Sequence, residues 1–88
     1  MSIKLRLDQV VGVLTNGREL IEVHGTTVAG CLDDFRQHYP EAGRILFDRH
    51  GALVGLVALN GRVVPPEQMD QKVCDNDELQ LIVTIAGG

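Results

Sequence analysis

The sequence predicts an α+β fold in which one main helix packs on one face of a mixed sheet of four to five strands. Near both ends of the chain, apolar side chains alternate with charged or polar ones, as in a strand with one buried face. In between, the apolar pattern changes to the period of a helix, about 3.6 residues. With 88 residues the chain suits one small domain. We expect residues 1–85 to form this domain and residues 86–88 to form a flexible tail.

The first two strands are expected to pair as a hairpin with a long connection. Residues 3–8 alternate cleanly between apolar and charged side chains, which predicts a half-buried strand. A less regular apolar stretch follows and ends at a turn signal, Asn16-Gly17. Residues 18–24 then return as a second strand, with Ile21 and Val23 expected to point inward.

A helix is expected from Val28 onward. Either Thr26 or Thr27 can cap it, because a threonine hydroxyl accepts a hydrogen bond from an early helical N–H. Pro40 ends the helix, since proline lacks the N–H and restricts the residue before it. Residues 41–47 follow as a short helix or a turn. The apolar stripe of the helix consists of Val28, Leu32, Phe35 and Tyr39.

The second half of the chain reads as three strands. Residues 53–59 are apolar on both faces, and Asn60-Gly61 predicts a two-residue hairpin turn of type I′. Residues 62–64 form the short return strand, which stops at two prolines. A turn at residues 75–77 precedes the last strand, residues 78–85. The side chains expected on one face of this strand are Leu79, Leu81, Val83 and Ile85.

This order of two strands, one helix and three strands fits the β-grasp arrangement, in which the first and last strands lie parallel at the sheet centre. A ferredoxin-like fold would need a second helix before the last strand. The polar segment of residues 65–74 begins with two prolines, which disfavours such a helix. The sequence therefore favours the β-grasp.

Composition excludes several classes of function. The net charge of −4 argues against a nucleic-acid partner, and no apolar run approaches the roughly 20 residues that span a bilayer. Cys31, expected to be buried in the helix, and Cys74 lack the spacing of a metal or redox pair, and a cytoplasmic chain is not expected to join them as a disulfide. His24, His38 and His50 lack metal-ligand spacing. We expect no bound metal or cofactor, no membrane partner and a cytoplasmic location.

The functional signal is the final pair, Gly87-Gly88. Glycine holds no strand geometry, so two glycines after the last strand predict a thin tail with a free carboxylate that can enter an enzyme tunnel. Ordinary fraying of a chain end is the alternative interpretation of the same pair.

Taken in order and spacing, five segments resemble the ubiquitin-like sulfur-carrier family. That family includes the small subunit of molybdopterin synthase and the sulfur carrier of thiamine biosynthesis. The resemblance covers nearly the whole chain and implies a β-grasp protein that is not itself an enzyme. The segments that carry it are Ile3-Lys4-Leu5-Arg6-Leu7, Thr27-Val28, Ala58-Leu59-Asn60-Gly61, Asp75-Asn76-Asp77-Glu78 and Ile85-Ala86-Gly87-Gly88.

The resemblance implies a mechanism centred on Gly88. An activating enzyme would use ATP to adenylate the Gly88 carboxylate, and a sulfur donor would convert the adenylate to a thiocarboxylate. A sulfur-accepting synthase, of which this chain could be the small subunit, would then take the sulfur. Gly87 would let the tail adopt the backbone angles that the enzymes require. The ATP belongs to the activating enzyme, and the chain itself is expected to bind no cofactor.

One face of the sheet must stay open if a single helix covers the other. If Val57, Leu59 and Val64 face the helix, then Ala58 faces outward together with its neighbours on alternate positions. An exposed apolar patch beside the tail commonly marks a partner site. The predicted partner-binding residues are Leu56, Val63 and Ile82, rimmed by Lys4 and Arg6.

Three questions stay open at this stage. The sulfur acceptor could belong to molybdopterin, thiamine or cysteine biosynthesis. The chain could instead be a ubiquitin-like modifier joined through Gly88 to lysines of other proteins, which would produce covalent conjugates in a lysate. It could also be a plain β-grasp interaction domain, whose function would survive deletion of Gly87 and Gly88.

Overall fold

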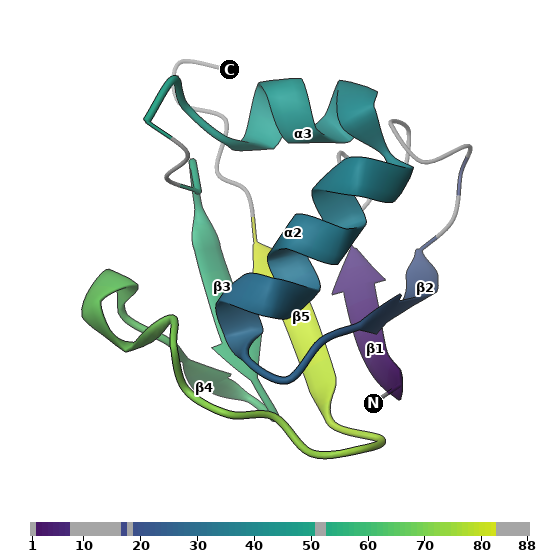
Figure 1. The fold of residues 1–88 in the computed structure, drawn as a ribbon, viewed down its shortest axis with the longest axis vertical. Helices are drawn as coiled ribbons and strands as arrows, with labels where there is room; N and C mark the ends of the chain where they lie inside the picture. The colour runs from purple at the N-terminus through teal and green to yellow at the C-terminus, as the bar shows by residue number, and fades with distance from the viewer. Residues whose placement is uncertain (1, 8–16, 18, 51–52, 83–88) are drawn as a thin grey trace.

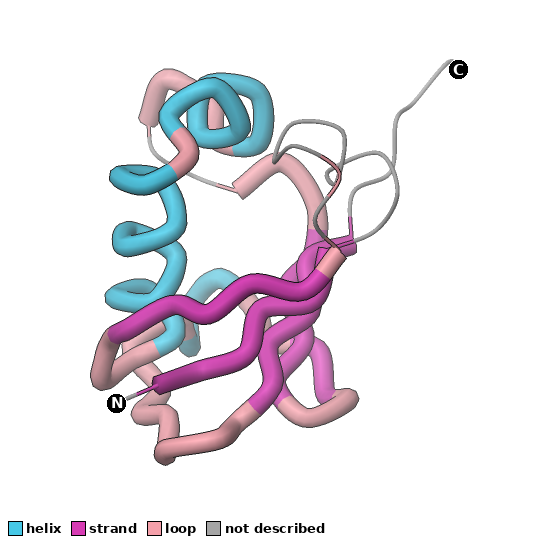
Figure 2. The backbone as a smooth tube through the Cα atoms, turned by 90° about the vertical axis from the view of Figure 1, so that its right-hand side faces the viewer, coloured by secondary structure: helices cyan, strands magenta, loops and turns pink. Residues whose placement is uncertain are grey.

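The computed structural model describes residues 2–7, 17, 19–50 and 53–82 of the chain. In this part of the chain a five-stranded sheet carries two α-helices on one side (Figures 1 and 2). The predicted fold class is confirmed. In chain order the elements are β1 (Ser2–Leu7), β2 (Leu20–His24), α2 (Val28–His38), α3 (Pro40–Leu46), β3 (Leu56–Leu59), β4 (Arg62–Val63), the 3₁₀ turn η1 (Pro66–Gln68) and β5 (Glu78–Ile82).

The sheet has the β-grasp order β2-β1-β5-β3-β4. The first and last strands, β1 and β5, are parallel neighbours at its centre, and the other pairs are antiparallel. Between β4 and β5 the chain forms only the short turn η1, so the second helix that a ferredoxin-like fold needs is not there. No helix among the described residues is long and apolar enough to cross a membrane.

The alternation predicted for the first two strands is confirmed. In β1 the three apolar side chains are buried and the two charged ones are exposed. In β2 the inward residues Ile21 and Val23 are buried, and the strand begins at Leu20 rather than at residue 18. Asp8, the predicted end of the first strand, and residues 9–16 of the predicted connection lie outside the described residues.

Helix α2 begins and ends where the sequence indicates. Of the two candidate caps, Thr27 is the one used: its Oγ1 accepts a hydrogen bond of 3.0 Å from the Gly30 N–H. The helix ends at His38, because Tyr39 precedes proline and leaves the helical region. Pro40 then starts α3, a position where its missing N–H costs nothing. The buried side chains of α2 are Val28, Cys31, Leu32 and Phe35.

The third strand is shorter than predicted. Residues 53–59 were expected to form it, but β3 begins at Leu56. Gly55 has φ of +145°, which interrupts the strand, and the Val54 N–H donates to the Leu46 carbonyl at the end of α3. Leu53 pairs with Phe47 in an isolated bridge. This segment is therefore attached to α3 and not to the sheet.

The hairpin predicted at Asn60-Gly61 is confirmed. Both residues have positive φ, +50° and +87°, as a type I′ turn requires. The register pairs Ala58 with Val63, and the Val64 N–H donates to the Val57 carbonyl at 2.8 Å. The turn therefore decides which side chains of β3 and β4 face the helices.

The core lies between the helices and the inward sheet face and is mostly aliphatic. Burying each such side chain contributes about 1.5–3 kcal/mol to folding. The largest fully buried side chains are Phe35, Ile3, Leu5, Leu46, Leu79, Leu81, Val23, Val28, Val57 and Cys31.

The junction of β2 and α2 is closely packed at Gly25. A Cβ atom there would lie 2.7 Å from the Cys31 backbone N and 2.8 Å from the Gly30 carbonyl carbon. Both atoms belong to the first turns of α2 and cannot rotate away. Gly25 is thus required by a close approach of two backbone segments.

We expect Gly25→Ala to lower the free energy of unfolding by about 1–3 kcal/mol, because the added methyl group overpacks this junction. Urea unfolding followed by circular dichroism measures the change. The control is Gly43→Ala in α3, where the new methyl group meets the Arg36 side chain at 3.4 Å and alanine favours the helix. Equal destabilisation by both variants would contradict the close approach at Gly25.

Candidate functional site

The sheet face opposite the helices brings together the apolar residues of the predicted patch. In register, Leu56 of β3 lies opposite Ile82 of β5, and Val63 of β4 lies opposite Ala58 of β3. Leu56 and Val63 expose 50% and 54% of their surface, and Ile82 is half-buried. The alternate residues on these strands, which the sequence assigns to the helix side, are buried: Val57, Leu59 and Val64.

Ala58 was expected to add apolar surface to the open face, but it does not. It is buried, at 5% exposure. In register it lies between Val63 and Gln80, and its single methyl group is shorter than either neighbour. Ala58 therefore provides a floor between larger side chains and offers little surface to a partner.

The two cations predicted at the rim lie on β1, on the exposed side of that strand. Arg6 is not free, because its Nε lies 2.6 Å from Oε1 of Glu78. Both side chains are about half-exposed, so the pair contributes only about 0.2–1 kcal/mol and can exchange partners. Lys4, opposite Glu78 in register, is exposed.

Sequence reasoning missed Leu20, which is 48% exposed and opposite Arg6. The sequence contained the information to predict this, because side chains alternate along a strand and Leu20 precedes the inward Ile21, which places Leu20 on the open face. The row that crosses the whole sheet is Leu20, Arg6, Gln80, Ala58 and Val63.

The turn before β5 fixes this strand against its neighbours. The Asp77 carboxylate accepts hydrogen bonds from the Cys74 N–H at 2.7 Å and from the Asn60 side-chain amide at 3.1 Å. Asn60 Oδ1 in turn accepts from the Glu78 N–H at 3.0 Å. The Cys74 bond, and then the Asn60 bond, lower the pKa of Asp77 below its ordinary value. The turn thus couples the β3–β4 hairpin to the start of β5.

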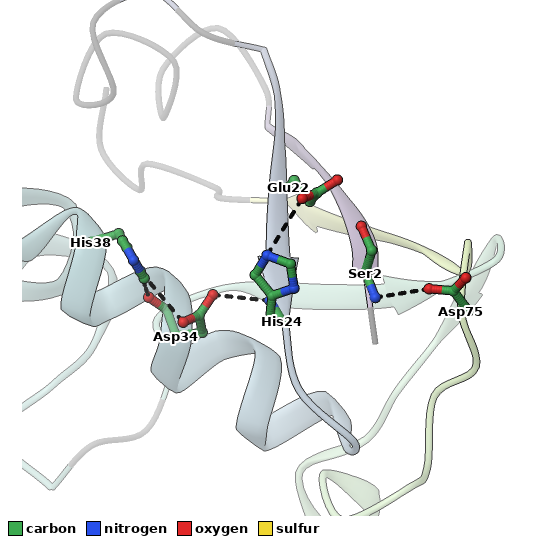
Figure 3. Close-up of polar contacts among 6 residues, drawn as sticks. All are labelled: Ser2, Glu22, His24, Asp34, His38 and Asp75. Atoms are coloured by element: carbon green, nitrogen blue, oxygen red, sulfur yellow. Dashed lines mark hydrogen bonds and ion pairs between the residues drawn. The ribbon is translucent and has the colours of Figure 1, made fainter.

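The same turn also holds the start of β1. The Ser2 N–H donates to Asp75 Oδ1 at 2.9 Å (Figure 3), and the Asn76 N–H donates to the Ser2 carbonyl at 2.9 Å. Asn76 has φ of +70°, in the left-handed region that asparagine tolerates better than most residues. The two central strands are therefore tied together at the end where β5 begins.

A second polar cluster joins β2 to α2 (Figure 3). Asp34 Oδ2 accepts from the His24 N–H at 2.9 Å, and Asp34 Oδ1 lies 3.4 Å from His38 Nδ1. The His24 ring lies 3.4 Å from Glu22 through its Nε2.

The third histidine lies elsewhere, in the turn after α3, where the His50 N–H donates to Asp48. No group of three or more His, Cys, Asp or Glu side chains in the described ranges could hold a metal ion.

The two cysteines are free thiols in different surroundings. Cys31 is buried in α2, and burial, with a smaller contribution from Asp34, raises its thiol pKa. Cys74 is exposed in the turn before β5. The expected burial of Cys31 is thus confirmed.

The diglycine predicted to carry the chemistry, Gly87-Gly88, lies outside the described residues, as do Val83 and Ile85. Its distance from the patch is still bounded by the chain. Gly88 is six residues beyond Ile82, so it lies within about 20 Å of that residue even if the backbone is fully extended. A protein that holds Gly88 therefore sits close to the end of β5.

Comparison with protein families supports the resemblance drawn from the sequence. The model of the ThiS family matches residues 7–88, which is nearly the whole chain. A comparison with curated proteins gives no match.

Solved structures share the fold at low sequence identity. SAMP1 from Haloferax volcanii superposes with a TM-score of 0.86 at 22% identity, over 100% of both chains. A chain of the Amycolatopsis orientalis BexX/CysO complex gives 0.81 at 22%, over 98% of this chain and 99% of that one. A chain in the complex of subunits 1 and 2 of the Helicobacter pylori molybdopterin-converting factor gives 0.64 at 16%, over 100% of both.

We expect Asp77→Ala to lower the free energy of unfolding at pH 7 by about 1 kcal/mol, through loss of the carboxylate hydrogen bonds. Because folding lowers the pKa of Asp77, its contribution is complete above the unfolded value of about 3.9 and is lost as pH falls through the folded value. The difference from wild type should therefore shrink below about pH 4. Urea unfolding between pH 7 and pH 2.5 checks this, with the exposed Asp70→Ala as control. A difference that does not vary with pH would contradict this role of the charge.

Proposed function

The chain belongs to the ThiS family of ubiquitin-like sulfur carriers and modifiers, and we propose that it carries sulfur on the carboxylate of Gly88. The observation that supports this most strongly is the reach of the family match, which runs to Gly88 and so includes the diglycine. Proteins of this kind are carriers or small subunits that do not catalyse a reaction alone, and this chain likewise is not an enzyme.

The chemistry begins with activation of a poor acylating group. The Gly88 carboxylate attacks the α-phosphorus of ATP in the activating enzyme, pyrophosphate leaves, and an acyl-adenylate forms. Sulfur delivered by the donor at the oxidation level of sulfide then displaces AMP from the carbonyl carbon. The product is a thiocarboxylate, which hands its sulfur to the acceptor in the synthase. Gly88 places no side chain beside the attacked carbon, and Gly87 gives the backbone its freedom.

The open sheet face is the proposed docking surface for the activating enzyme and the synthase. Exposed Leu56 and Val63 supply apolar area, and Lys4 and Arg6 supply charges that can pair with a partner. Ile82 connects this face to the tail. In this scheme the chain binds no cofactor of its own, and ATP is bound by the activating enzyme.

The acceptor is proposed from relatives that share the fold. The similar chains include members of a BexX/CysO complex and of a molybdopterin-converting factor complex of subunits 1 and 2. Sulfur transfer for molybdopterin, cysteine or thiamine synthesis in the cytoplasm fits the same carrier. A synthase subunit encoded beside this chain would identify the acceptor.

A second candidate is a protein modifier joined through Gly88 to lysine amines. The observation that favours it is the fold similarity to SAMP1, the small archaeal modifier protein 1. The activation step is the same, and only the nucleophile that receives the acyl group differs. Conjugates of this chain in a lysate, lost when Gly88 is deleted, would favour the modifier.

We expect wild-type protein, incubated with ATP, a sulfur donor and an activating enzyme, to gain a thiocarboxylate that a variant lacking Gly88 does not gain. Intact-protein mass spectrometry follows the reaction. Replacing one oxygen by sulfur adds nearly the same mass as oxidation of Met69 or a cysteine, so a thiocarboxylate-selective reagent is needed as well. No reactive species with any of several activating enzymes would instead support a plain interaction domain.

We expect Leu56→Asp and Val63→Asp to weaken binding of the activating enzyme about tenfold or more, since each places a charge in an apolar contact. Isothermal titration calorimetry measures the affinity. Both residues are about half-exposed, so unfolding should change little. Ile45→Asp is the matched control, because Ile45 is 59% exposed on α3, on the helix side of the sheet. An equal loss in Ile45→Asp would argue against the sheet face.

A further inference from the structure

Two hollows lie beside the helices. The first includes Leu56 and Val63 of the proposed docking surface, and the second is lined by none of its residues. One, of about 540 Å³, lies between α2 and the edge formed by β3 and β4. The other, of about 600 Å³, lies between the end of α2, α3 and the turn that follows α3. Their linings differ in chemistry, which allows the kind of ligand to be inferred.

The first hollow is mainly apolar. Its lining includes Leu32 and Val64, which are buried, and Leu53 and Met69, which are partly exposed. Methionine is flexible and polarisable, so it adapts to ligands of different shape. A volume of this size and an apolar lining suit one or two aliphatic or aromatic side chains.

The second hollow gathers three arginines, Arg36, Arg44 and Arg49, against two aspartates, Asp33 and Asp48. The whole chain has only eight lysines and arginines and a net charge of −4. Positive and negative charges here nearly balance, so the ligand is inferred from geometry: guanidinium binds carboxylates in a two-pronged arrangement, and an arginine that can exchange its partner suits a carboxylate ligand.

These arginines are available to a ligand. Arg44 pairs with Glu41 at 3.1 Å, but both side chains are about three-quarters exposed, and such a pair contributes about 0–1 kcal/mol. Arg49 has no hydrogen bond or ion pair with any described residue. An incoming carboxylate can therefore replace Glu41 and engage Arg49 at little cost.

The two hollows are contiguous at Arg36 and Phe47, which line both. The Arg36 guanidinium carbon lies 4.6 Å from the centre of the Phe47 ring, a cation–π contact that holds the charge between the hollows. Arg36 also lies 3.6 Å from Asp33 through its Nη1. A single ligand with an apolar group next to an anionic group could thus place one group in each hollow.

We propose that this helix-side surface binds an acidic segment of a partner protein. An apolar side chain of the segment enters the hollow beside Met69, and its carboxylates pair with Arg44 and Arg49. The Arg36–Phe47 pair sits at the junction between the two contacts. This binding uses neither Gly88 nor the cations of the open sheet face. Its apolar hollow includes Leu56 and Val63, so the two proposed surfaces adjoin at the edge formed by β3 and β4.

The test uses the full chain and a capped synthetic peptide in which a pair of leucines precedes a run of glutamates. We expect backbone amide shifts in an NMR titration to concentrate at α3, the turn after Phe47 and Met69, and not at Lys4 or Arg6. A peptide with glutamines in place of the glutamates should bind at least tenfold more weakly. Added salt should weaken binding of the glutamate peptide alone, because screening acts on the charges.

A charge-reversed protein tests the arginines directly. Arg44→Glu combined with Arg49→Glu should lower peptide affinity at least tenfold, and Arg62→Glu, on β4 outside both hollows, should leave it unchanged. Protein lacking Gly88 should bind as wild type does, which separates this proposal from the proposed function.

Three results would overturn the proposal. They are equal binding of the glutamine peptide, shifts centred on Lys4 and Arg6, and full affinity in the protein with reversed charges at Arg44 and Arg49. Self-association of the free chain through the same residues, seen by sedimentation velocity, would show that a second copy occupies the surface instead.

Discussion

The parallel pairing of β1 and β5 is the interaction on which the rest of the structure depends. It joins segments more than seventy residues apart, matching Leu5 with Leu79 and Leu7 with Leu81, all buried. β2 pairs with β1, β3 pairs with β5, β4 pairs in turn with β3, and the helices cover the inward face. Since the pairing is so distant in sequence, the loop-closure entropy is offset only when the core beneath the pair also forms. The turn around Asp77 contributes by binding both strands where β5 begins.

This constraint links the fold to the proposed chemistry. The two-residue period of β5 sends Leu79 and Leu81 into the core and Gln80 and Ile82 toward the open face. The last strand therefore contributes both to the core and to the open face from which the proposed docking surface is built. A carrier with no catalytic groups of its own needs both a stable core and an exposed face, because its partner enzymes must bind the domain while they reach its carboxylate.

The sequence predicted best what is local. The strand alternation, the Thr27 cap and the hairpin at Asn60-Gly61 each depend on neighbours a few residues away, and all three are confirmed. The features that the sequence could not predict depend on contacts between residues that are far apart in the chain. Strand β3 is short because the end of α3 binds Val54, and the Asn60–Asp77 bond links two turns that the sequence treats separately. For the site, Leu56 and Val63 are exposed as expected and Ala58 is not, and the hollows depend on how α2 and α3 pack.

The two surfaces adjoin at the edge formed by β3 and β4, where Leu56 and Val63 belong to both, and this bears on how a carrier moves between enzymes. In the proposed scheme, an enzyme that holds Gly88 comes within about 20 Å of Ile82, which lies opposite Leu56. Helix α3, which carries Arg44, lies on the other side of the sheet (Figure 2), and Arg49 follows it in the next turn. A partner bound there would not use Gly88, but it would share Leu56 and Val63 with an enzyme on the open sheet face. The arginine contacts could then change in strength without altering the contacts of the open sheet face, whereas a change at Leu56 or Val63 would affect both.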